Sequence, residues 1–99
     1  MSIEIFDPAF STIERAMGKS VRVQETISNN VANAQTPGYV PKKFDEVLNK
    51  EIDRQDRKTV NLEEEMAEMS KNSGKYSAYI KLLSAKLGVL RSVVTMGRK

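Results

Sequence analysis

The side chains with the most obvious chemical capacity are four glutamates that lie close together where the last third of the chain begins. They are Glu63, Glu64, Glu65 and Glu68. Carboxylates at such spacing can bind a divalent cation or supply groups for acid–base catalysis. No second cluster or convergent polar pocket is apparent in the sequence to complete such a site. The pattern favours the alternative, which is negative charge placed at the positive end of a helix dipole.

The composition excludes most other catalytic chemistry. The 99 residues include no histidine and no cysteine. This removes the usual zinc and thiol sites, disulfides, and every Ser–His or Cys–His nucleophile pair. We therefore expect a protein that is not an enzyme, with no catalytic residues, no cofactor, no metal and no small-molecule substrate.

Positive charge is concentrated at the C-terminal end. From Met69 onward the chain has seven Lys or Arg residues and no acid, within a net charge of +3. A basic helix can contact the phosphates of a nucleic acid or lie on a membrane surface, so a small basic regulator is the alternative function. However, no recognised nucleic-acid-binding motif occurs, and apolar residues fill the positions between the lysines. We expect a solvated surface that takes part in assembly, without a nucleic-acid partner.

A long helix is predicted over about 8–34. Asp7 can cap it, and Pro8 fits the first helical turn. Apolar residues then recur in two heptad rows that two polar residues interrupt. The rows are Phe10, Met17, Gln24, Val31 and Ile13, Ser20, Ile27, Ala34. A turn and loop over 35–43 ends the helix, because Pro37-Gly38 is a favoured centre of a type II turn.

The middle of the chain has a weaker pattern. Phe44, Val47, Leu48 and Ile52 are spaced i, i+3, i+4 and i+8, which predicts a short amphipathic helix over about 44–53. The stretch 54–60 is charged, which predicts a solvated connector.

The last helix, over about 61–96, has the strongest periodicity. Asn61 is a good cap, and Glu64 follows three residues later as in a capping box. A heptad row then runs for more than four heptads. It comprises Leu62, Met66, Met69, Ser73, Tyr76, Ile80, Leu83, Leu87, Leu90 and Val94, and a second row beside it comprises Tyr79, Leu82, Val89, Val93 and Met96. Two rows on one helix are expected where that helix lies between several neighbours.

These elements predict a single all-α domain over 1–99. Its two long heptad-patterned terminal helices pack as an antiparallel hairpin or coiled coil, and the short middle helix lies on an extended loop. The helices span roughly 40 Å and 54 Å at ~1.5 Å per residue, so part of the longer one is left uncovered. The packing and assembly residues are expected to be Phe10, Ile13, Met17, Ile27, Val31, Tyr76, Ile80, Leu83, Leu87, Leu90 and Val94.

The segment 27–39, ISNNVANAQTPGY, resembles the signature of the flagellar rod and hook family. In that family an Asn- and Ala-rich helix end runs into Thr-Pro-Gly-Tyr. The residues that match the motif are Asn29, Asn30, Asn33, Thr36, Pro37, Gly38 and Tyr39. The stretch 60–69 with Asn72, Tyr76 and the Leu-rich run to Val94 resembles the proximal-rod branch of the family. The region between Tyr39 and Val60 is shorter than family members usually carry.

The resemblance implies a structural subunit of the proximal rod, the drive shaft of the flagellar motor in the basal body, on its periplasmic side. It implies copies of the chain and other rod proteins, FlgC-like and FliE-like, as partners. It also implies export by the flagellar type III apparatus without cleavage of a signal peptide, and no basic leader with an apolar core is visible at the N-terminus. Phe44 and Leu48 resemble the signal by which early export substrates dock at the export gate. The alternative is that the two residues pack locally on one short helix.

Overall fold

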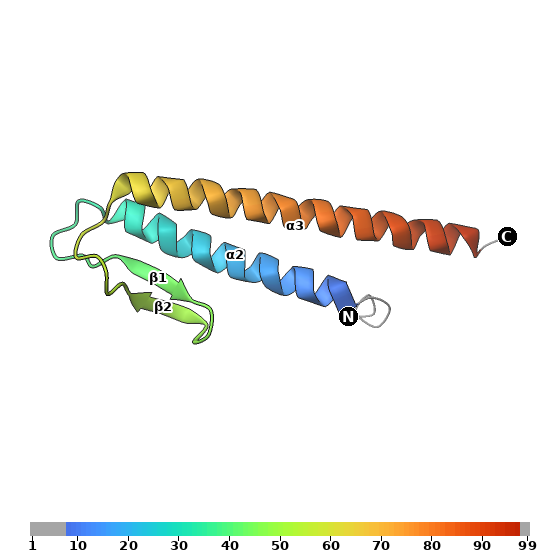
Figure 1. Ribbon diagram of the computed structural model, residues 1–99, viewed down its shortest axis with the longest axis horizontal. Helices are drawn as coiled ribbons and strands as arrows, with labels where there is room; N and C mark the ends of the chain where they lie inside the picture. Colours follow the sequence, from blue (N-terminus) through green and yellow to red (C-terminus); the bar gives the residue numbers. More distant parts are fainter. Residues whose placement is uncertain (1–7, 98–99) are drawn as a thin grey trace.

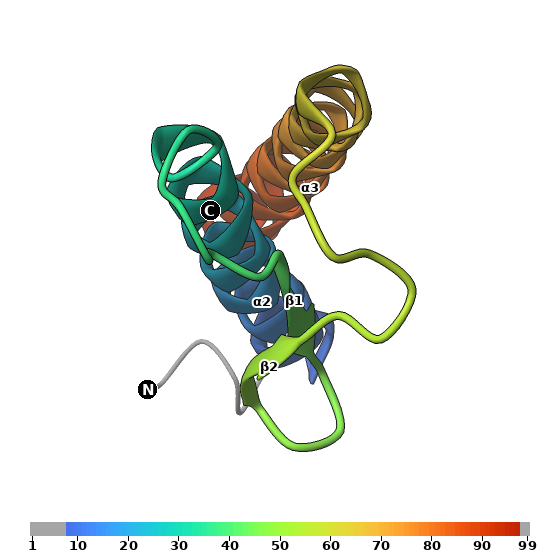
Figure 2. The same cartoon turned by 90° about the vertical axis from the view of Figure 1, so that its left-hand side faces the viewer.

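The computed structural model describes residues 8–97. Two long helices, α2 (Pro8–Ala32) and α3 (Leu62–Met96), run antiparallel and side by side, and a hairpin of β1 (Lys42–Asp45) and β2 (Lys50–Asp53) joins them (Figures 1 and 2). The prediction of two long helices that pack against each other is confirmed. The predicted cap Asp7 and the N-terminal stretch judged free of a signal sequence lie outside the described residues.

The two helices differ in length, and among the described residues this difference leaves one end of α3 without a partner helix. The molecule is a rod of 66 × 24 × 17 Å. α2 has 25 residues and α3 has 35, so ten residues of α3, or ~15 Å, exceed the length of α2. Figure 1 shows α3 running past the start of α2. Asn61 caps the other end of α3, where its side chain accepts a hydrogen bond from the Glu64 N–H at 3.1 Å.

The predicted middle helix is wrong, and with it the all-α fold class. Residues 42–53 form an antiparallel hairpin in which Lys43 pairs with Ile52 and Phe44 with Glu51. The i, i+3, i+4 spacing matched a helix, but so short a segment is not stable as an isolated helix. Contacts with α2 favour the extended form instead, since the backbone of Lys42 is bound by the side chain of Asn30.

The side of α3 that faces α2 is rotated about the helix axis relative to the predicted main heptad row. Among the described residues of α3, only Glu65 and Asn72 are buried. The half-buried positions continue that side toward the C-terminus, and they are Met69, Tyr76, Tyr79, Leu83 and Leu90. Alternate members of the predicted row therefore lie beside the contact, and Ile80 and Leu87 remain 43% and 38% exposed.

The hydrophobic core between the helices is small. Phe10, Ile13 and Ile27 are the buried hydrophobic residues in the described part of the chain, and all three come from α2. The other buried side chains of the helices are polar or charged, namely Ser20, Thr26, Asn30, Glu65 and Asn72. Within residues 8–97, neither helix has the length and apolar character needed to cross a bilayer.

Candidate assembly surface

The centre of the helix pair is held by a polar cluster rather than by leucines. Ser20 Oγ donates to Asn72 Oδ1 at 3.0 Å, and Asn72 Nδ2 donates to the Ser20 carbonyl at 2.8 Å and to Gln24 Oε1 at 3.0 Å. Ser20 and Gln24 are the two residues that interrupted the predicted apolar rows of the first helix. A register shift would leave these buried groups without partners, so the cluster fixes how α3 lies along α2.

Asn30, from the signature motif, is the point where α2, β1 and α3 meet. Its side chain is 1% exposed and uses its full hydrogen-bonding capacity. Nδ2 donates to the Lys42 carbonyl at 2.8 Å and to Glu65 Oε2 at 3.2 Å. Oδ1 accepts from the Lys42 N–H and from the Tyr39 hydroxyl, both at 2.9 Å. The amide thus binds the first residue of β1 as a neighbouring strand would.

The turn predicted at Pro37-Gly38 is present. Gly38 has a φ of 78°, and the Tyr39 N–H donates to the Thr36 carbonyl at 3.2 Å, as in a type II turn. Asn33 closes the helix end, because its Nδ2 donates to the Asn29 carbonyl and its Oδ1 accepts from Thr36 Oγ1. The turn reverses the chain so that Tyr39 reaches back to Asn30.

Tyr39 completes this junction from the loop side. Burial, followed by the charge of Glu51, raises the pKa of Tyr39, so its hydroxyl stays protonated and can donate to Asn30. Glu51 is itself held against α2, since its Oε1 accepts from Thr26 Oγ1 at 2.9 Å and from Asn29 Nδ2 at 3.3 Å. Several residues of the family motif therefore bind the hairpin to α2.

The glutamates at the start of α3 are bound by arginines from the connector. Arg54 lies 2.9 Å from Glu64 and 3.4 Å from the buried Glu65, and Arg57 also pairs with Glu64. The hydrogen bond from Arg54 is the main cause that lowers the pKa of Glu64. Within residues 8–97, no group of three or more acids, His or Cys is arranged to hold a metal ion. The connector 54–60 is therefore held against the start of α3 by ion pairs and is not a free linker.

The loop between the strands presents two aliphatic side chains to solvent. Asp45 Oδ1 accepts from the N–H groups of Val47 and Leu48, both at 2.9 Å, and Asn49 has a positive φ of 57°. Val47 is 94% exposed. Phe44 lies on β1 with Arg22 5.0 Å from its ring centroid, so it faces α2. Phe44 and Leu48 do not share a helix, and the interpretation that they pack together on one is wrong.

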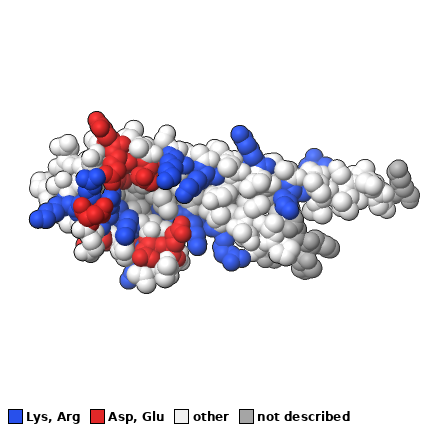
Figure 3. All heavy atoms as spheres, viewed as in Figure 1, with Lys and Arg blue, Asp and Glu red and all other residues white. Residues whose placement is uncertain are grey.

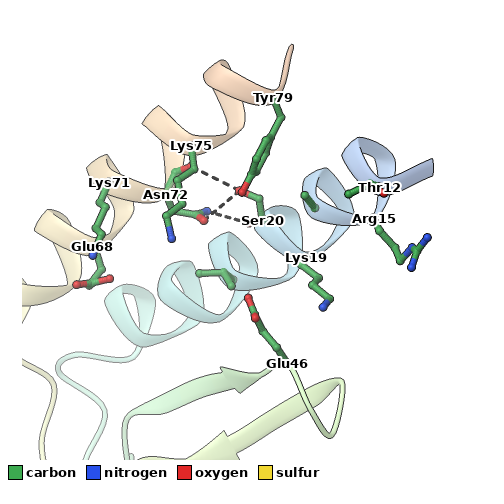
Figure 4. Close-up of a pocket in the computed structure, with 12 residues that line it drawn as sticks. Thr12, Arg15, Lys19, Ser20, Glu46, Glu68, Lys71, Asn72, Lys75 and Tyr79 are labelled. Atoms are coloured by element: carbon green, nitrogen blue, oxygen red, sulfur yellow. Dashed lines mark hydrogen bonds between the residues drawn. The ribbon is translucent and has the colours of Figure 1, made fainter. Parts of the chain in front are cut away.

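A polar groove of about 370 Å³ runs between the helices on the side of the hairpin loop (Figure 4). The basic side chains that line it are Arg15, Lys19, Lys71 and Lys75, and the acids are Glu46 and Glu68. Charges of both signs share this groove, so it does not form the uninterrupted basic surface that a phosphate backbone favours. In Figure 3, acidic side chains gather over the junction and the hairpin, whereas the charged side chains of residues 69–97 are all basic.

The exposed apolar residues of α3 lie on both sides of its contact with α2. Ile80, Leu87 and Val94 form one flank, which we call the first flank, and each is at least 38% exposed. Leu82, Val89 and Met96 form the second flank, and each is at least 53% exposed. With α2 in contact between the two, α3 has room for a neighbour on each side.

The sequence-predicted packing residues thus divide between these environments. Phe10, Ile13 and Ile27 are buried between the helices, whereas Ile80, Leu87 and Val94 are exposed. The half-buried members are Met17, Val31, Tyr76, Leu83 and Leu90. Sequence reasoning missed the structural roles of Arg54, Glu65 and Asn72. The available signal was the polar pair Ser20 and Gln24 inside an apolar row, which requires a polar partner on the facing helix.

Comparison with known proteins agrees with these features. The family model for flagella basal body rod proteins matches residues 12–39, which run from the first turns of α2 through the Pro37-Gly38 turn. A relative from Bacillus subtilis (strain 168) is 24% identical over 129 residues, covering 97% of this chain and all of the relative. The chain therefore resembles the flagellar basal-body rod proteins. The relative it resembles over nearly its whole length is the flagellar basal body rod protein FlgB.

Proposed function

We propose that this chain is a structural subunit of the proximal rod of the bacterial flagellum, and that it works by packing against neighbouring subunits and not by catalysis. The observation that carries the proposal is the pair of apolar flanks on α3. A monomeric protein seldom leaves so many large aliphatic side chains in solvent along one helix. Each of them gains roughly 1.5–3 kcal/mol if a neighbour buries it fully.

The partners are copies of this chain and related rod proteins of the FlgC and FliE type. The subunit reaches the periplasmic side of the basal body through the flagellar type III export apparatus, with its N-terminus retained. The matched segment 12–39 supports this placement, because it forms the helix and turn that set the direction of the hairpin. The rival interpretation, a small basic regulator of nucleic acid or membrane, has no support from either comparison.

The test is the variant Leu87→Asp in cells that otherwise build a rod. Leu87 lies on the first flank, and a carboxylate that a neighbour would bury without a partner is costly. We expect secretion of the variant to continue while rod assembly and motility are lost. Lys81→Asp is the matched control, because Lys81 is exposed on the same helix and is a polar position already. Normal swimming of the Leu87→Asp strain would show that this flank is not a packing surface.

Export is tested separately from assembly. If Phe44 and Leu48 form a docking signal for the export gate, the Phe44→Ala variant is secreted less than the parent. The measurement is made in cells that cannot build a rod, where assembly has no influence on the amount secreted. Unchanged secretion there would remove Phe44 from the export signal.

A further inference from the structure

Within residues 8–97, a groove in the second flank of α3 is open and almost entirely apolar. It has a volume of about 340 Å³ and lies at the end of the molecule where α2 begins. Phe10 contributes from α2, and the exposed residues Leu82, Val89 and Val93 contribute from α3. An apolar cavity of ~150 Å³ accepts a benzene molecule, so this groove has room for two aliphatic side chains.

The hairpin loop carries a matching projection. Val47 and Leu48 are adjacent and exposed, and the hydrogen bonds from their N–H groups to Asp45 hold the loop in one shape. A loop that is already ordered loses little conformational entropy when it binds. The only large hydrophobic residues of the described chain exposed outside the two helices are these two.

The charged residues next to the two apolar surfaces differ in sign, and the basic residues Lys50 and Arg22 lie at the other end of the loop, beside Asn49. Asp45 and Glu46 lie at the loop beside Val47. Lys86 lines the groove, and residues 69–97 include five Lys or Arg and no acid. Opposite charges at the rim of an apolar contact favour the correct docking orientation over others.

The two surfaces are also offset along the molecule. Figure 1 shows the hairpin loop on the side of α2 away from α3, and well short of the end where α3 runs past α2. A contact between surfaces at different places on the same chain is heterologous, and its repetition builds a ring or a helical array rather than a closed dimer. That is the kind of assembly a rod requires.

We propose that the Val47-Leu48 loop of one subunit docks into the Phe10–Val89 groove of a second copy of this chain. The inference rests on the proposed function, and it specifies which surface meets which. The loop of each copy is free for the groove of the next, so the contact propagates. The first flank of α3 remains available for other neighbours in the rod.

The chain has no cysteine, so introduced cysteines report one contact each. Val47→Cys and Val89→Cys are produced together in cells in place of the parent chain, and basal bodies are isolated, oxidised and run without reductant. A disulfide needs Cα atoms within about 4.4–6.8 Å, which requires direct contact. We expect a band at twice the subunit mass from the mixed cells and none from cells with either variant alone. A subunit with both cysteines should give a ladder of multimers.

Val47→Cys mixed with Val21→Cys is the matched control, because Val21 is an exposed valine on α2 away from the groove. Several results would overturn the proposal. A dimer from Val89→Cys alone would mean that α3 meets α3 across a two-fold axis, and one from Val47→Cys alone would mean that loop meets loop. If the doubly substituted chain forms only an intramolecular disulfide, the loop contacts the groove of its own chain. If Val47→Cys forms a disulfide with a different protein, the loop contacts that protein instead.

The experiment also separates this inference from the proposed function. If the subunit is present in the isolated basal bodies but no mixed disulfide forms, the loop does not occupy the groove and the rod function stands. If the subunit is missing from basal bodies of cells that carry the unsubstituted chain, the proposed function fails and this inference fails with it.

Discussion

Replacement of Asn30 by aspartate exchanges one heavy atom, the amide nitrogen, for an oxygen, and tests whether the signature asparagine holds the junction together. The carboxylate keeps an acceptor for the Lys42 N–H and the Tyr39 hydroxyl, which both bind Asn30 Oδ1. It loses the two donations from Nδ2, and its second oxygen then faces the Lys42 carbonyl and the carboxylate of Glu65. A buried charge without a partner costs about 3–5 kcal/mol. We expect a loss of that size in the free energy of unfolding.

Glu65→Gln in the same chain should recover part of this loss. The new amide can donate to the aspartate at the distance where Asn30 now donates to Glu65, and the repulsion between two carboxylates is removed. The contact with the Lys42 carbonyl stays unrepaired, so recovery is incomplete. A double-mutant cycle should therefore give a coupling free energy well above the ~0.3–0.5 kcal/mol scatter of independent sites.

The assay is urea unfolding of the four chains, followed by helical circular dichroism. Because the parent has a small core, sucrose is added at one concentration throughout to raise the stability of every variant. Asn29→Asp is the matched control, since Asn29 is the adjacent residue, is exposed, and makes one longer side-chain bond to Glu51. If Asn30→Asp unfolds at the urea concentration of the control, or the cycle shows no coupling, Asn30 does not hold the junction as argued.

The unfolding free energy of the Asn30→Asp variant should also depend on pH. Burial and the nearby Glu65 would raise the pKa of the aspartate above its unfolded value. Protonation restores a donor toward the Lys42 carbonyl, so the variant should approach the parent at low pH and lose stability relative to it as pH rises through the folded pKa. A difference in unfolding free energy that does not vary with pH would contradict this.

Two further predictions concern the turn and the connector. Gly38→Val should be secreted but poorly incorporated into basal bodies, because a β-branched residue at a φ of 78° is strained by roughly 1–3 kcal/mol. The loss of incorporation should be smaller for Gly38→Asn, because asparagine adopts a positive φ more readily. If both variants are incorporated like the parent, the turn is not a constraint on assembly. The pKa of Glu64 is lowered from its ordinary 4.5 by Arg54, so the stability that this pair gives is present above that pH and is lost as pH falls through the folded pKa. Glu64→Gln should flatten the acid side of a stability–pH curve, and an unchanged curve would argue against the pair.

The long helices could be predicted from the sequence because their signals are local. Pro8 at a first turn, Asn61 as a cap and sustained heptads each act within a few residues, and the turn at Gly38 follows from glycine and proline alone. The hairpin could not be predicted in this way. Its strands are held by Asn30 and Thr26 on a distant part of the chain, and nothing within 42–53 encodes that contact.

The rotation of α3 has a similar cause. Periodicity identified a broad apolar face on α3, and counting alone placed Ser73 and Ile80 in its main heptad row. In the folded chain the polar cluster sets the rotation of α3 about its axis. Asn72 forms hydrogen bonds with Ser20 and Gln24, and in this orientation Glu65 accepts a hydrogen bond from Asn30. A buried polar group gains its energy from one geometry only, whereas leucine side chains tolerate many.

This difference explains how a subunit with a small hydrophobic core can still have a defined shape. Hydrogen bonds contribute only about 0.5–1.5 kcal/mol each to stability, but leaving one unmade costs more, so the buried polar groups select a single register without making the monomer robust. The aliphatic groups that would have made it robust lie on the flanks of α3, where Leu87 and Val89 face outward. Their burial is available only in contact with another subunit. The free energy of unfolding therefore increases when the subunit assembles, since whatever binds the folded chain stabilises it by mass action.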